Sequence, residues 1–191
     1  MNSSFTIELR ASYALNYLIY VQNAVLNKRE TGSERNSKFP YLNCDDWHLT
    51  DDNFEHVFTE VWEDMLGKIA LNPQSDHNGV GETERKVYLR LFKPDREGEL
   101  GFVESWQSFN AWFGGYWGHY AIESLIDNTL INEMYTKLRP HFQSNKLSIL
   151  VLYDEPTFIH KELKALQHVN VVSFHQLRHA FDQTIERIIR G

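Results

Sequence analysis

The last third of the chain alternates strand-like and helix-like segments, and this order restricts the fold more than any other feature. Residues 146–153 (KLSILVLY) and 169–174 (VNVVSF) are apolar runs rich in strand formers. Helical patterns over 156–168 and 175–189 follow them in turn. A strand, a helical crossover and a second strand predict two parallel, buried strands. The sequence therefore predicts an α/β (or α+β) fold with a β-α-β-α unit over 146–191.

Residues 12–26 (SYALNYLIYVQNAVL) are apolar on nearly every side. Such a segment is typical of a membrane span, a signal sequence or a helix at the centre of a fold. Amide side chains interrupt it at Asn16, Gln22 and Asn23. We therefore expect a buried central helix and a cytoplasmic protein with no membrane segment. The single cysteine, Cys44, agrees with this location, because a disulfide framework needs pairs of cysteines.

The remaining segments are predicted to be mostly helical. A helix with strong three- and four-residue periodicity is expected between Thr50, its N-cap, and the stop at Asn72-Pro73. Alternation over 85–92 and a following turn predict a hairpin with the segment 101–105, which makes the predicted sheet small and mixed. The predicted single, helix-rich domain (1–191) has a helical part (1–72) with an exposed loop (27–45), a hairpin with helices (84–143) and the β-α-β-α unit (146–191).

The stretch FNAWFGGYWGHY (109–120) concentrates aromatic rings around glycines. Rings at three- and four-residue steps predict a buried helical stripe, made of Trp106, Phe109, Phe113, Trp117 and Tyr120. Two glycines in a helix interior are unfavourable, so Gly114-Gly115 is expected to separate helices over about 104–113 and 117–139. Trp112 and Tyr116 lie off the stripe and are expected to face a partner or a ligand.

Two acids are the first candidates for chemistry. Asp154 and Glu155 follow the predicted 146–153 strand, and ligands of open α/β sheets bind at the carboxyl ends of strands. The pair could bind a metal or act as acid and base. The acids also precede Pro156, where a helix is expected to start, and acidic caps are common there.

Histidines supply two further candidates. His119 and Glu123 lie four residues apart, as in an acid–base pair or an ordinary surface ion pair. Three residues on one helical face are weak metal-ligand candidates or a solvated face: His175, His179 and Asp182. The sequence contains no phosphate-binding glycine loop, HExxH motif or GxSxG motif. No cofactor is therefore predicted, and no reaction is assigned.

Charge is distributed unevenly along the chain. No lysine or arginine occurs between Phe39 and Gly67. Eight of the 26 acids lie there, so the rest of the chain is close to neutral although the formal net charge is −7. The acids are Asp45, Asp46, Asp51, Asp52, Glu55, Glu60, Glu63 and Asp64. On an amphipathic helix such acids face water, where they maintain solubility or attract a cationic partner.

These patterns favour a small acidic interaction protein that docks a basic protein partner. An immunity or antitoxin-like inhibitor, or an accessory subunit, needs no catalytic motif. The predicted partner-binding residues are Asp45, Asp46, Asp52, Glu55, Glu63, Asp64, Trp112 and Tyr116. Nucleic acid is not expected at the acidic face, which repels phosphates. One alternative is a metal-dependent hydrolase or nuclease that uses the carboxylates after the 146–153 strand. Another is a small-ligand sensor whose pocket is the aromatic stretch.

Overall fold

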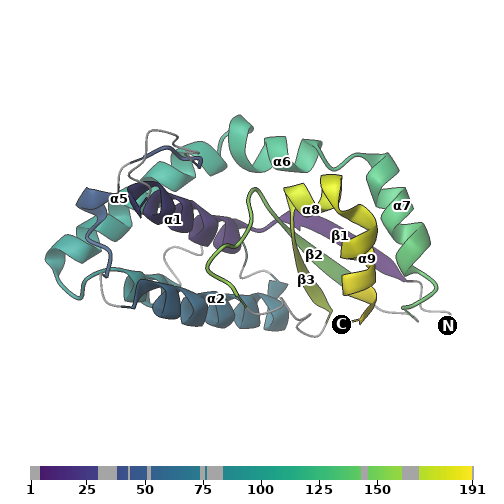
Figure 1. Ribbon diagram of the computed structural model, residues 1–191, viewed down its shortest axis with the longest axis horizontal. Coiled ribbons are helices and arrows are strands. Elements are labelled where there is room, and N and C mark those ends of the chain that lie inside the picture. The colour runs from purple at the N-terminus through teal and green to yellow at the C-terminus, as the bar shows by residue number, and fades with distance from the viewer. Residues whose placement is uncertain are drawn as a thin grey trace.

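A parallel three-stranded sheet forms one end of the molecule in the computed structural model (Figure 1). The model describes residues 5–29, 38–42, 44–50, 53–73, 76, 84–142, 146–160 and 168–190. The strand order is β1-β2-β3, for β1 (Thr6–Ala11), β2 (Lys146–Leu152) and β3 (Val169–Ser173). The register pairs Thr6 with Lys146 and Ser148 with Val169.

The sheet confirms the two predicted C-terminal strands. All of β3, and all of β2 after Lys146, is buried, as continuous apolar runs require. The expectation of a mixed sheet is wrong, because all three strands are parallel. The sequence patterns above do not predict β1, whose residues alternate and are mostly half-buried at the edge of the sheet. The result is a helix-rich α/β fold.

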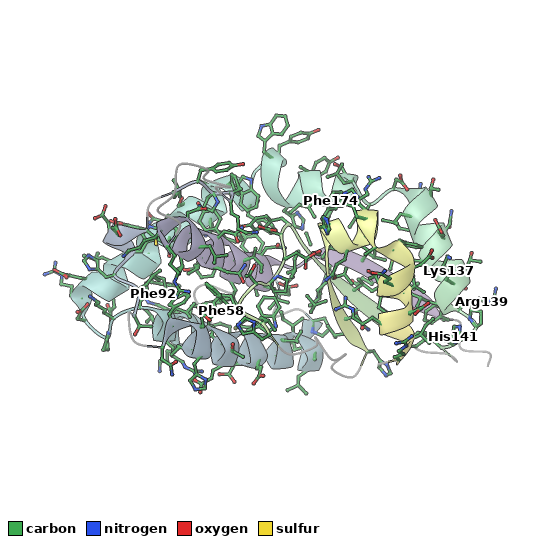
Figure 2. All side chains as sticks on the ribbon, viewed as in Figure 1. Phe58, Phe92, Lys137, Arg139, His141 and Phe174 are labelled. Carbon is green, nitrogen blue, oxygen red and sulfur yellow. The ribbon has the colours of Figure 1, made fainter. Side chains whose placement is uncertain are left out.

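The predicted central helix is present as α1 (Tyr13–Arg29), and every residue from Tyr13 to Val25 is buried. It leads from the end of β1 into the other half of the molecule, which contains α2 (Phe54–Leu71) and α5 (Arg96–Phe113) (Figure 1). Side chains such as Phe58 lie between these helices (Figure 2). None of the helices that the structure describes is long and apolar enough to cross a membrane.

The predicted start of the second helix needs correction. Its N-cap is Asn53, in the left-handed region (φ 62°), and Thr50 instead donates its amide to the carbonyl of Leu91 at 2.9 Å. Part of the loop expected to be exposed is turned inward, because Cys44 is buried and residues Asp45–Trp47 form a 3-10 helix, η1.

The predicted hairpin is wrong. Helix α4 (Arg85–Tyr88) and the 3-10 helix η3 (Leu89–Leu91) occupy its first segment, and α5 occupies the second. Asp95 caps α5, because its side chain accepts a hydrogen bond from the amide of Gly98 at 2.8 Å. Gly98 and Gly101 do not turn the chain. They bring α5 close to the backbone of neighbouring segments, where a Cβ would overlap with carbonyl oxygens.

The later helices are shorter than predicted. After α5 come a π-helical turn, η4 (Tyr116–Tyr120), and the helices α6 (Ala121–Ser124) and α7 (Asn128–Leu138). The last predicted helix is divided into α8 (Phe174–His179) and α9 (Phe181–Arg190). Helix α8 contacts β3, and α9 contacts α7. Residues 156–160 are not helical, and 161–167 of the predicted crossover helix lie outside the described residues.

Candidate functional site

The carboxyl edge of the sheet lies at the junction of the two halves, since α1 starts there directly after β1 (Figure 1). Asp154 follows β2 at this edge, and its side chain is tied to two other segments. One carboxylate oxygen accepts hydrogen bonds from the Asn23 side chain at 2.9 Å and from the Lys38 ammonium at 2.8 Å. The other accepts the amide of Glu155 at 2.8 Å.

Glu155 points to a different set of partners, at the start of α8. The Ser173 hydroxyl donates to one of its carboxylate oxygens, and the Gln176 amide donates to the other at 3.2 Å. His175 Nδ1 lies 3.6 Å from the same carboxylate. Ser173 and Gln176 also form the capping box of α8. Asp154 and Glu155 therefore do not share a ligand position, and their bonds connect β2 to α1 and β3.

Three buried amide side chains of α1, those of Asn16, Gln22 and Asn23, complete this arrangement, and the sequence patterns did not reveal their role. Asn16 donates to the carbonyls of Ser12 and Val151 and accepts the amide of Tyr153 at 2.9 Å. Gln22 and Asn23, which are also fully buried, bond to the backbone of Glu155, Phe158 and Phe39. A helix buried on all sides uses these amides to satisfy the backbone polar groups of the chain that leaves β2.

At the end of β1, a buried carboxylate caps α1. Asp76 accepts hydrogen bonds from the Ser12 hydroxyl at 3.1 Å and the Ala14 amide at 2.9 Å. Its second oxygen lies 3.7 Å from Arg10 Nε and has no hydrogen-bond partner. Burial raises the pKa of the Asp76 carboxyl, and the nearby amide, Arg10 and hydroxyl do not offset this effect.

Asp76→Asn is therefore expected to change how stability depends on pH. Because the folded-state pKa is raised, Asp76 contributes stability that is fully present below its unfolded pKa of about 3.9 and is lost as pH rises through the folded pKa. Urea unfolding of the wild-type protein and the variant at a series of pH values measures this loss. As pH rises, the free energy of unfolding of the variant should increasingly exceed that of the wild-type protein. Asp182→Asn, at an exposed acid, is the control. A difference that is constant with pH would contradict the assignment.

His119 and Glu123 do come together, with Nε2 3.2 Å from the carboxylate. The same carboxylate accepts the amide of Ala11 at 3.4 Å, so the pair lies beside the end of β1. Both side chains are partly exposed, whereas Asp154 and Glu155 bond to other side chains, such as Asn23 and Gln176.

The proposed metal ligands are only partly brought together. The rings of His175 and His179 lie 4.8 Å apart, whereas Asp182 pairs with Lys137 on α7 at 2.8 Å. Among the described residues, no group of three histidine, cysteine or acidic side chains could hold a metal ion.

The acids of the 45–64 segment lie on η1 and on the outer side of α2, whose inner residues are buried. Cations from other segments reach several of them. The pairs are Lys28–Asp45, Arg29–Glu55, Arg90–Glu60 and Arg90–Asp64. Arg29 holds the pKa of Glu55 below its usual value. These pairs involve Lys28, Arg29 and Arg90 and four of the described acids, while Asp51 and Asp52 lie outside the described residues.

The aromatic stretch divides at the predicted break, since α5 ends at Phe113. Phe109 and Phe113 are fully buried, as expected. Trp117 and Tyr120, expected in the same stripe, are exposed, because the phase of the helix is lost after Gly114. Tyr116 is exposed as predicted, whereas the Trp112 ring packs among those of Tyr20, Phe39 and Tyr153.

Among the residues that the structure describes, the helical half contains two hollows that are not lined by the aromatic stretch. One, of about 390 Å³, lies beside the end of α1 and is lined by Lys28, Cys44 and Lys93 among others. The other is an open groove of about 860 Å³ between α2, η3 and the start of α5. Burial raises the pKa of the Cys44 thiol, which disfavours the reactive thiolate.

Comparison with known proteins gives no match: no family model, no curated protein and no solved structure matches this chain.

Proposed function

We propose that the chain is an interaction protein that docks a basic protein partner, as an immunity or antitoxin-like inhibitor or an accessory subunit does. The docking region is the acidic surface, defined here as Asp45, Asp46, Glu55, Glu60, Glu63 and Asp64. Asp52 of the predicted set lies outside the described residues. The supporting observation is that these acids lie on the water-facing side of α2 and η1, in a segment with no lysine or arginine between Phe39 and Gly67.

The packing of α2 explains why its acids face outward. Phe58, Val61 and Met65 on its inner side are fully buried, which fixes the rotation of the helix. A surface of one charge sign raises the association rate of an oppositely charged partner and repels partners of its own sign. Exposed acids on a rigid, well-packed helix meet this requirement.

The alternative of a hydrolase or nuclease has no comparable support. Asp154 is bonded to Asn23 and Lys38, and Glu155 to Ser173 and Gln176. Each carboxylate serves to join segments, and the two do not point to one position where a metal or substrate would be held.

The proposal predicts salt-sensitive binding that depends on the acidic surface. Glu60→Gln, Glu63→Gln and Asp64→Asn together are expected to weaken capture of basic proteins from a lysate about tenfold at low salt, because the steering field is reduced. The matched control removes three acids at the sheet end, by Glu133→Gln, Asp182→Asn and Glu186→Gln. The affinity of each captured protein, purified and titrated, gives the measurement. Equal affinity for the two triple variants, or capture of acidic proteins only, would contradict the proposal.

A further inference from the structure

Three neighbouring aromatic side chains are exposed on the π-helical turn η4. We call Tyr116, Trp117 and Tyr120 the aromatic turn, and their exposed fractions are 64%, 79% and 58%. Isolated exposed rings are common, but adjacent ones that form a contiguous patch mark interaction sites. The backbone of this turn is kinked at Gly118, which has non-helical angles (φ −105°, ψ −105°).

The aromatic turn is a defined platform. The Tyr116 ring lies 5.2 Å from the Trp117 ring at 89° and 5.2 Å from the Tyr120 ring at 32°. Gly118 holds the turn against the end of α5, since a Cβ there would lie 2.4 Å from the Phe113 Cα. Side chains in this region stand away from the ribbon on the upper side of the molecule (Figure 2). The close backbone contact thus turns the rings outward.

Charge around the aromatic turn selects the partner. No lysine or arginine occurs from residue 97 to residue 136, and within this run Glu123 and Asp127 follow the aromatic turn. The five cation–π contacts seen among the described residues use other rings, such as Phe102 and Phe158. Arg178, which donates to the Leu125 carbonyl nearby, lies over Phe174.

The position of the aromatic turn separates it from the acidic surface. It precedes α6 on the upper side of the molecule, whereas α2 lies along the lower side (Figure 1). The partner-binding residues predicted from the sequence include both Tyr116 and acids of α2, so they lie on two separate surfaces of the molecule.

We propose that the aromatic turn binds arginine side chains of a basic protein partner by stacking and cation–π contact. Ring faces carry negative potential and attract cations, and the planar guanidinium stacks on them more extensively than a lysine ammonium. The nearby acids Glu123 and Asp127 and the formal net charge of −7 add attraction for a cation and repel anionic lipid or nucleic acid. The inference rests on the proposed function for the basic character of the partner, but it assigns a second site.

Titration with two peptides of equal charge tests this site. The probes are twelve-residue peptides that alternate glycine with arginine or with lysine, and Kd is measured by calorimetry. The protein is expected to bind the arginine peptide at least fivefold more tightly than the lysine peptide. Trp117→Leu with Tyr120→Leu should remove this preference, because leucine keeps the apolar character without the ring quadrupole. Tyr116→Phe with Tyr120→Phe keeps the rings and should preserve it.

Controls distinguish the possible outcomes. The acidic-surface variant Glu60→Gln, Glu63→Gln, Asp64→Asn should weaken both peptides equally and keep the arginine preference, so the two proposals fail independently. Circular dichroism melting should show unchanged midpoints for the ring variants, since these side chains are exposed. Equal affinity for the two peptides, an unchanged preference after leucine substitution, binding to phosphatidylcholine vesicles in place of the peptide, or ring-dependent self-association in sedimentation would each overturn the assignment.

Discussion

Asn16→Leu is expected to lower the free energy of unfolding by about 3–5 kcal/mol. The leucine has a similar volume, but it removes the side chain that bonds to the Ser12 and Val151 carbonyls and to the Tyr153 amide. The Ser12 and Val151 carbonyls keep backbone partners, so the bonds to them are worth about 1 kcal/mol each, whereas the Tyr153 amide is left without a partner at a cost of about 1–3 kcal/mol. Urea unfolding followed by tryptophan fluorescence measures the effect.

Asn132→Leu is the matched control, because Asn132 is exposed on α7. Its expected effect is within about 0.5 kcal/mol. If Asn16→Leu costs no more than this control, the amides of α1 do not hold the chain after β2.

The second large effect is on the free energy of unfolding of two glycine-to-alanine variants. One substitution is expected to lower it and the other to raise it, although both glycines lie in helices. Gly101→Ala places a Cβ 1.9 Å from the Trp47 carbonyl oxygen, so α5 and η1 must separate. A loss of about 3 kcal/mol is expected, at the upper end of ordinary overpacking. Gly67→Ala, in the interior of α2, meets nothing within 4 Å and should stabilise the protein by up to about 1 kcal/mol.

Thermal and urea unfolding of both alanine variants give the comparison. Stabilisation by both substitutions would show that the contact between α5 and η1 is looser than described. Destabilisation by both would show that the outer side of α2 at Gly67 is not open.

Long segments with one dominant pattern were predictable. The apolar runs of β2 and β3 and the periodicity of α2 have no competing interpretation of similar strength. In the segment 85–92 the alternation of Val87, Leu89 and Leu91 predicts a strand, whereas the buried pair Tyr88 and Leu91 has the three-residue spacing of a short helix. The signal against a hairpin was Asp95, three residues before Gly98, which is the spacing of a helix cap.

Two features of the candidate sites could not be obtained from sequence spacing. Trp117 and Tyr120 continue the spacing of Phe109 and Phe113, but the break at Gly114 changes the direction in which later side chains point. The neutralisation of part of the acidic surface depends on ion pairs between distant segments, such as Arg90 with Asp64 at 2.6 Å. Local periodicity in the sequence predicts neither the direction of side chains after a helix break nor an ion pair between residues far apart in the chain.

The pairing of β1 with β2 has a consequence for the order in which the chain can fold during synthesis. Thr6 of β1 pairs with Lys146 of β2, so the first strand made must wait for most of the chain to leave the ribosome. Asn16 and Gln22 of α1 wait for the same region, because they bond to Val151 of β2 and to Tyr153 and Glu155 after it. Apolar surface of α1 stays uncovered during this interval, and such non-local contacts slow folding and favour aggregation.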